Sequence, residues 1–232
     1  MSGATREIAE SNDALLTNRL VVSAARVCVD ALSPLSTQDW RSVRAHDLEW
    51  SVWDTLVHLN DDLYFYAAQI LLASESDYIC FELSADDHAD SQRLLTALTV
   101  NARLLAAVAA DADPSARGHH VFGASDPAGF AAMGMVESLI HTYDMVRGLD
   151  EESTWQPPDD LAGPVLRRLF PHAPHGADAG PGEVLLHMCG RIPLGNDPRR
   201  SDWRWYGDAQ HPLSASSQAV LVGDGLRAQR QY

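Results

Sequence analysis

The stretch DPAGFAAMGMVESLIHTYDMVRG, residues 126–148, carries the clearest helix signals in the chain. Asp126 is expected to be the N-cap and Pro127 the first helical residue, while Gly148 is placed to end the helix. Apolar residues fill most of the stretch between these two boundaries. It is therefore expected to form a long helix that packs against other elements.

Three earlier stretches also have apolar residues at helical spacing, namely 12–35, 51–74 and 91–112. The second begins with clear signals, because Ser51 is suited to the N-cap and Asp54 lies in the first turn, where the helix dipole favours a carboxylate. Residues 75–90 have no helical period and are expected to form a loop. Four long helices without a convincing strand between them predict an all-α fold, a four-helix bundle.

The composition changes after Gly148. The following segments are, in chain order, a Pro-rich acidic linker (150–160), a short helix (161–170), a loop (171–181) and a second short helix (182–192). From Ser214 onward the character is mixed, and the sequence leaves a short strand and an unordered end both open. We therefore divide the chain into a helical bundle, 1–150, and a small, mostly helical C-terminal extension packed on it, 151–232.

The charge balance excludes some classes of partner. The chain has 232 residues, and 17 Lys and Arg against 32 Asp and Glu give a formal net charge of −15. Non-specific nucleic-acid binding and attachment to anionic membranes both depend on clustered cationic side chains. The sequence therefore predicts no nucleic-acid partner and no membrane partner.

The expected location is the cytoplasm. No apolar run reaches the ~20 residues of a membrane span, and the first residues lack the features of a signal peptide. Cys28, Cys80 and Cys189 are odd in number and far apart, which argues against a disulfide framework and against a cysteine zinc site. Monomer and homodimer both remain open.

A polar stripe interrupts the helix over 126–148. At 100° per residue, Glu137, His141 and Asp144 lie within about 60° of one another, so they share one face. Polar groups inside an apolar helix cost free energy unless each finds a partner. A carboxylate and a His four residues apart can both bind one divalent ion, although such pairs are also common as simple polar contacts.

A third ligand would have to come from another helix, and His58 is the natural choice. The helical wheel places it beside Phe65 and Leu72, at the edge of the apolar arc of its helix. Periodicity alone favours a hydrogen-bonded or exposed histidine over a metal ligand at this position.

Several short motifs together resemble a known superfamily. The matching residues are Trp50, Trp53, His58 and Leu59, followed by Glu137, His141 and Asp144. This combination is similar to the DinB/YfiT-like superfamily of metalloenzymes, and within it to the mycothiol-dependent maleylpyruvate isomerase N-terminal domain family. The resemblance covers residues 12–150 well and residues 160–207 loosely.

The resemblance implies a DinB-like bundle that holds one divalent metal through His58, Glu137 and His141. Zn²⁺ is the expected ion, and Ni²⁺, Mn²⁺ and Fe²⁺ suit the same ligands. Mycothiol is the implied cosubstrate of an isomerase or thiol S-transferase acting on a small unsaturated or electrophilic substrate. Asp144 is then expected to orient a ligand or relay a proton, and Arg191 to pair with a substrate carboxylate. A surface carboxylate near a helix end and a surface arginine on a short helix are the alternatives that stay open for these two residues.

Two other functions remain open. One is a thiol-independent, metal-assisted isomerase or cyclase of secondary metabolism, and the other is a non-catalytic helical-bundle binding protein. The C-terminal part is shorter than in maleylpyruvate isomerase itself, so the sequence does not identify the substrate. The remaining loop histidines are expected to be solvated: His119, His120, His172 and His175.

Overall fold

The computed structural model describes residues 19–174 and 179–207, and this part of the chain is all-α. Its elements are a helix over 19–32, the 3₁₀ turn η1 (Ser33–Leu35), α2 (Val52–Leu72), α3 (Ser91–Asp111), α4 (Pro127–Leu149), α5 (Asp159–Leu169) and α6 (Pro181–Met188). The described residues contain three isolated β-bridges and no strand. The predicted all-α class is confirmed, while the expectations for residues 12–18 and for the end from Ser214 lie outside the described residues.

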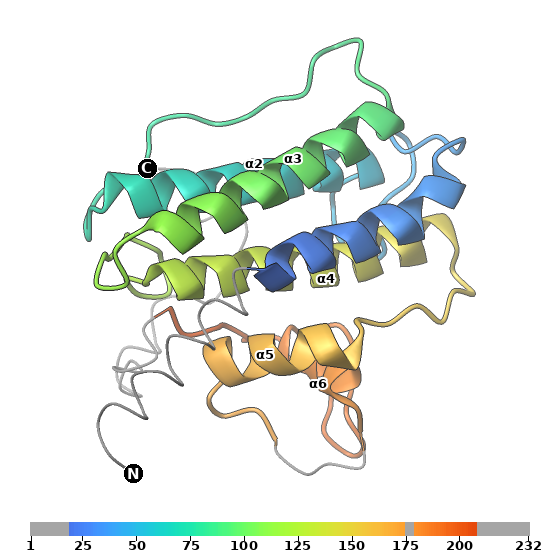
Figure 1. Cartoon of the computed structure of the whole chain (residues 1–232). Helices are drawn as coiled ribbons and strands as arrows, with labels where there is room; N and C mark the ends of the chain where they lie inside the picture. The colour runs from blue at the N-terminus through green and yellow to red at the C-terminus, as the bar shows by residue number, and fades with distance from the viewer. Residues whose placement is uncertain (1–18, 175–178, 208–232) are drawn as a thin grey trace.

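The helix α4 lies at the centre of the fold. The helix over 19–32, α2, α3 and α4 run alongside one another, and α5 and α6 lie below α4 (Figure 1). Helix α4 packs against α2, α3 and α5, and nearly every residue from Pro127 to Val146 is buried. Polar side chains of α4 up to Asp144 therefore lie inside the protein, whichever way they point.

Side-chain caps fix the starts of the two helices that carry the polar stripe and His58. Ser51 Oγ accepts a hydrogen bond from the backbone N–H of Asp54 over 3.0 Å, at the start of α2. Asp126 Oδ1 accepts one from the backbone N–H of Gly129 over 2.7 Å, at the start of α4. Both predicted N-caps are confirmed, and they set the register of the residues that follow.

The prediction that Gly148 ends α4 is wrong, because the helix continues to Leu149. The glycine is required by close packing against the loop that precedes α2. A Cβ at this position would lie 2.1 Å from the carbonyl oxygen of Arg44 and 2.9 Å from the backbone nitrogen of His46. The backbone of residues 44–46 leaves no room for a side chain at this position.

We expect Gly148→Ala to lower the free energy of unfolding by about 1–3 kcal/mol, the usual cost of forcing extra atoms into a packed site. Gly163→Ala in α5 is the matched control, because its Cβ would meet only the end of the Arg167 side chain at 3.4 Å. Urea unfolding followed by circular dichroism measures both variants. Equal stabilities of the two variants would contradict the packing account.

The short helix α6 ends four residues earlier than predicted, at Met188. Gly190 adopts a φ of +70°, in the left-handed region. The backbone N–H groups of Gly190 and Arg191 donate back to the carbonyls of His187 and Leu186, over 2.9 and 2.8 Å. This is the Schellman arrangement, and it stops the helix and turns the chain at Arg191.

By length and composition, α3 is the one described helix that could cross a membrane. Its most apolar 18-residue window has a mean hydropathy of 1.4, and 33% of that window is buried. The prediction that no run is long and apolar enough is therefore wrong for α3. Core helices meet the same criterion, and α3 packs along α2, so the feature is weak evidence for a membrane span.

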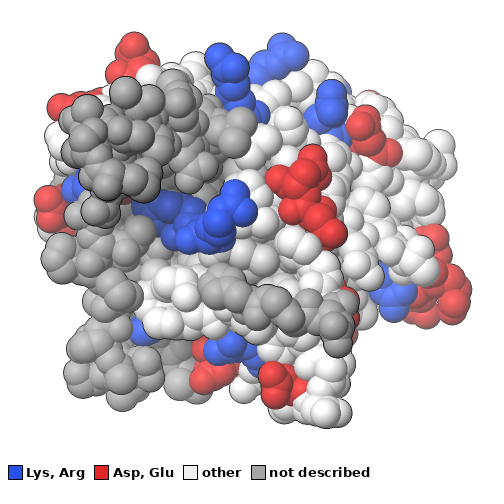
Figure 2. Space-filling view, turned by 60° about the horizontal axis from the view of Figure 1, so that its bottom comes forward, with Lys and Arg blue, Asp and Glu red and all other residues white. Residues whose placement is uncertain are grey.

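The face nearest α5 carries charges of both signs. Figure 2 shows Arg and acidic side chains in small, separate groups on a mostly neutral surface. The described part of this face has no continuous basic patch. Its surface gives no support to nucleic-acid binding there.

Candidate metal centre

His58 from α2 and the pair Glu137 and His141 from α4 come together between these two helices. Each residue offers one ligand atom, and the three atoms lie within 4.8 Å of one another. The exposed fractions of the three residues are 8%, 4% and 1%. The structure thus brings together the three residues predicted from the sequence, and together they could hold one metal ion.

The hydrogen bonding of His141 suits a metal ligand. Its Nδ1 lies 3.1 Å from Asp144 Oδ2, and because a carboxylate only accepts, this nitrogen donates. Its Nε2 lies 3.2 Å from Glu137 Oε2 but makes no well-aligned hydrogen bond within the described residues. Metal-binding histidines usually have this arrangement. One ring nitrogen donates to a carboxylate, and the other ring nitrogen faces a second ligand.

Asp144 is fixed in turn by Arg191, from the turn after α6. The guanidinium donates through Nε to Asp144 Oδ1 over 3.0 Å and through Nη2 to Oδ2 over 2.7 Å. Burial alone would raise the pKa of Asp144, but the charge of Arg191 and the hydrogen bonds from His141 and Arg191 lower it to about 2. The predicted role of Asp144 in orienting a ligand therefore has a geometric basis.

The same contacts change the interpretation of Arg191. The Nε and Nη2 groups of its guanidinium both donate to Asp144, and Nη1 donates to the carbonyl of Cys189 over 2.8 Å. Its side chain is only 8% exposed. We therefore infer that Arg191 holds Asp144 in place. To pair with a substrate carboxylate, its guanidinium would have to break the hydrogen bonds to Asp144.

Two further residues of the centre were missed by sequence analysis. His58 Nε2 lies 2.9 Å from Asp62 Oδ2, one turn along α2. Tyr66, one more turn along, donates its hydroxyl to Glu137 Oε1 over 3.2 Å. The spacing 58, 62, 66 places all three on one face of α2, so the i, i+4 pattern was the available signal.

Metal binding at this centre is expected to release about one proton per ion at pH 7. Burial alone would lower the pKa of His141, but Asp144 and Glu137 outweigh it and raise the pKa to about 9. The proton on Nε2 must leave before this nitrogen can bind a metal. Zinc affinity should therefore rise by about tenfold per pH unit between pH 7 and 9.

Calorimetric zinc titrations in buffers with different ionisation enthalpies measure this proton release. Asp144→Asn is the informative variant, because it removes the carboxylate that holds the proton on His141. We expect it to release fewer protons and to bind zinc about 10–100-fold more weakly. An affinity that is flat from pH 7 to 9 in the native protein would contradict the assignment of His141.

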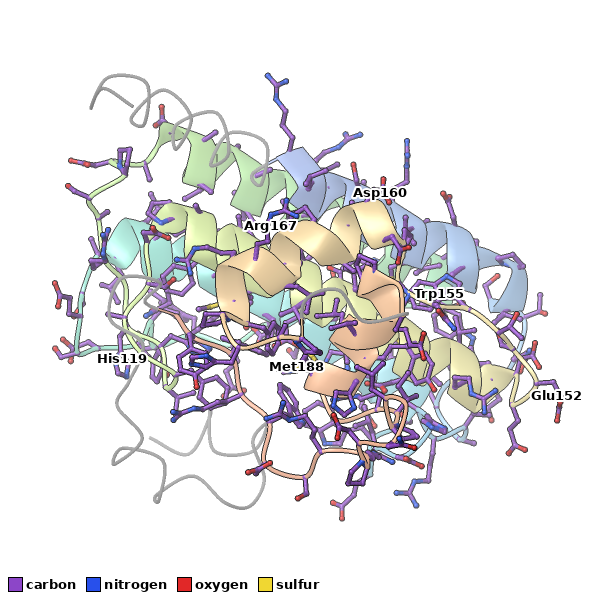
Figure 3. The ribbon with its side chains drawn as sticks, turned by 90° about the horizontal axis from the view of Figure 1, so that it is seen from below. His119, Glu152, Trp155, Asp160, Arg167 and Met188 are labelled. Carbon is purple, nitrogen blue, oxygen red and sulfur yellow. The ribbon has the colours of Figure 1, made fainter. Side chains whose placement is uncertain are left out.

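A small cavity of about 10 Å³ adjoins Glu137 and His141, which is room for roughly one water molecule. Its other walls include Arg191, Trp203 and Trp205. Figure 3, seen from below, shows α5 and α6 in front of α4, with Met188 at the end of α6. The chain segment that follows Met188 supplies Arg191, Trp203 and Trp205 to the cavity wall. This segment therefore bounds the space beside Glu137 and His141.

The prediction that His120 is a solvated loop residue is wrong, because it is only 2% exposed. Its ring lies against Tyr66, Phe122 and Trp205. Burial lowers the pKa of His120 to about 4. His172 is exposed and His119 is partly exposed, whereas His175 lies outside the described residues.

No known protein family, curated protein or solved structure matches the chain. The metal centre is therefore supported by its own geometry, and the family resemblance by the short motifs that carry it.

Proposed function

We propose that the protein is a divalent-metal-dependent enzyme with a DinB-like four-helix bundle and a C-terminal extension. It acts on a small unsaturated or electrophilic substrate, as an isomerase or thiol S-transferase that uses mycothiol. The observation that carries the proposal is the buried set His58, Glu137 and His141, with ligand atoms within 4.8 Å of one another. Three protein ligands are typical of catalytic zinc sites, since structural sites use four.

A bound divalent ion would supply Lewis acidity, lowering the pKa of a thiol so that its sulfur is a thiolate at neutral pH. The protein's own groups keep the ligands in place. Asp144 holds the imidazole of His141 in one orientation, and Arg191 holds Asp144. Tyr66 occupies one oxygen of Glu137 and directs the other toward His141.

The two buried cysteines of the chain are poor candidates for the nucleophile. Burial raises the pKa of Cys28 to about 12 and raises that of Cys189 further above its usual range. Both therefore remain thiols at neutral pH, and thiols are weak nucleophiles. Cys189 lines the cavity beside Glu137 and His141, where burial favours its neutral thiol form.

The test is an assay of the zinc-loaded protein, with and without mycothiol, against a panel of cis-enoic acids and electrophiles. We expect turnover that requires both zinc and mycothiol, and a loss of at least about 100-fold in Glu137→Gln, which keeps the shape but removes the charge. Turnover without any thiol would leave a metal-assisted isomerase or cyclase. Equal turnover by zinc-free protein would overturn the proposal.

A further inference from the structure

Two buried ring N–H groups lie near the metal centre. Nε2 of His120 and Nε1 of Trp205 have no acceptor among residues 19–174 and 179–207, and both residues are 2% exposed. Their rings are stacked, with centroids 5.7 Å apart and planes at 30°. Buried polar atoms in native proteins are nearly always paired, so two unpaired donors on stacked rings call for an explanation.

The hydrogen bond at the other nitrogen of His120 makes Nε2 a donor. The backbone N–H of Phe122 points at His120 Nδ1 over 3.1 Å, so Nδ1 must carry the lone pair. A neutral imidazole with a lone pair on Nδ1 has its proton on Nε2. The lowered pKa of His120 agrees with this neutral form at pH 7. The indole Nε1 of Trp205 is a donor in every state.

Trp205 borders the metal centre directly, and His120 is connected to it through Tyr66. Trp205 lines the same small cavity as Glu137 and His141. His120 lies against Tyr66, with ring centroids 6.2 Å apart, and the hydroxyl of Tyr66 donates to Glu137. Trp205 therefore adjoins the ligands, and His120 stacks on Trp205 and contacts Tyr66, which donates to one of them.

We infer that His120 and Trp205 form a subsite that donates hydrogen bonds to an oxygen atom of the molecule bound at the metal centre. The inference deepens the proposed function and rests on it for the identity of the neighbouring ion. It narrows the substrate class to molecules that present a carboxylate or carbonyl oxygen beside the reacting group.

The chemistry of the donors favours oxygen over sulfur. Neutral N–H groups pair well with carboxylate and carbonyl oxygens, whereas sulfur is a weak acceptor. Fixed donors in a dry site also stabilise negative charge that develops on an oxygen during a reaction. The pair would therefore hold the substrate oxygen and leave the sulfur of a thiol to the metal.

The direct test is a nuclear magnetic resonance titration of the indole N–H of Trp205, assigned by its loss in Trp205→Phe. Acetate presents a carboxylate oxygen and acetamide a carbonyl oxygen, and both are titrated into zinc-loaded protein and into zinc-free protein. We expect a saturable downfield shift of this proton with at least one of the two probes. No shift with either probe, in either form of the protein, would overturn the inference.

Matched variants separate donation by His120 from simple proximity. His120→Gln keeps a side-chain N–H, while His120→Leu removes it at similar size. We expect acetate or acetamide to bind about tenfold more weakly to the Leu variant and nearly unchanged to the Gln variant. Ethanethiol, which has no oxygen, should bind zinc-loaded forms of both variants equally well.

The readouts also separate this inference from the proposed function. A native protein that takes up no zinc, yet shows the Trp205 shift, contradicts the metal centre and supports the subsite. A native protein that takes up one zinc and binds acetate equally in both His120 variants contradicts the subsite and leaves the metal centre standing. The shift in the unmodified protein decides the inference even if His120→Leu fails to fold.

Discussion

Replacing His141 with Ala is expected to remove nearly all of the zinc that the native protein holds. His141 is 1% exposed and its Nε2 faces Glu137, so its removal leaves only His58 and Glu137 of the predicted ligand set. Loss of a residue that merely supports a ligand already costs about 10–100-fold in metal affinity, and loss of a ligand should cost more. His58→Ala should behave in the same way.

Elemental analysis of the purified proteins, followed by competition with a chelator of known affinity, measures this loss. His119→Ala is the control, because His119 is partly exposed and its Nδ1 lies 3.1 Å from the carbonyl of Glu75, away from the ligand set. We expect about one equivalent of zinc in the native protein and in the control. Full zinc occupancy in His141→Ala would show that the ion is bound elsewhere.

Arg191→Met is expected to lower the free energy of unfolding of zinc-free protein by about 3–5 kcal/mol, the usual cost of leaving one member of a buried ion pair without its partner. The side chain of Asp144 is 2% exposed, and Arg191 supplies two of its hydrogen bonds. His141 alone would remain to balance the carboxylate. Urea unfolding after removal of metal by a chelator measures the effect.

The double variant Asp144→Asn with Arg191→Met is the matched control, because it removes the buried charge together with its partner. It should recover most of the lost stability.

The stabilising effect of the pair should also depend on pH in a defined direction. Because folding lowers the pKa of Asp144 from about 3.9 to about 2, the contribution is present above pH 4 and is lost as the pH falls toward 2. A loss below about 1 kcal/mol in Arg191→Met would contradict the account.

Local signals were sufficient to predict the helices and part of the metal centre. Ser51 and Asp126 could be identified as N-caps because a cap depends on residues only three positions away. The pair Glu137 and His141 could be placed together because four residues make about one helical turn. His58 could be added only through the resemblance, since its own position on the helical wheel favoured a simpler role.

The rest of the site depends on contacts between distant segments. Arg191 meets Asp144 across 47 positions because a left-handed Gly190 turns the chain after α6. His120 lies in a loop, which has no periodicity to reveal its burial. The packing of Tyr66, Phe122 and Trp205 around its ring makes it a core residue. Gly148 was misread for a related reason, because the backbone it meets belongs to the loop before α2.

X-ray absorption spectroscopy of the zinc-loaded protein tests the central claim most directly, since it reports the atoms bound to the ion. We expect one zinc per chain, with two imidazole nitrogens and carboxylate or water oxygens at ~2.0–2.2 Å and no sulfur from the protein. One imidazole should disappear from the spectrum in His58→Ala loaded at high zinc concentration. A shell that contains cysteine sulfur, or one that is unchanged in both His58→Ala and His141→Ala, would contradict a metal centre built from His58, Glu137 and His141.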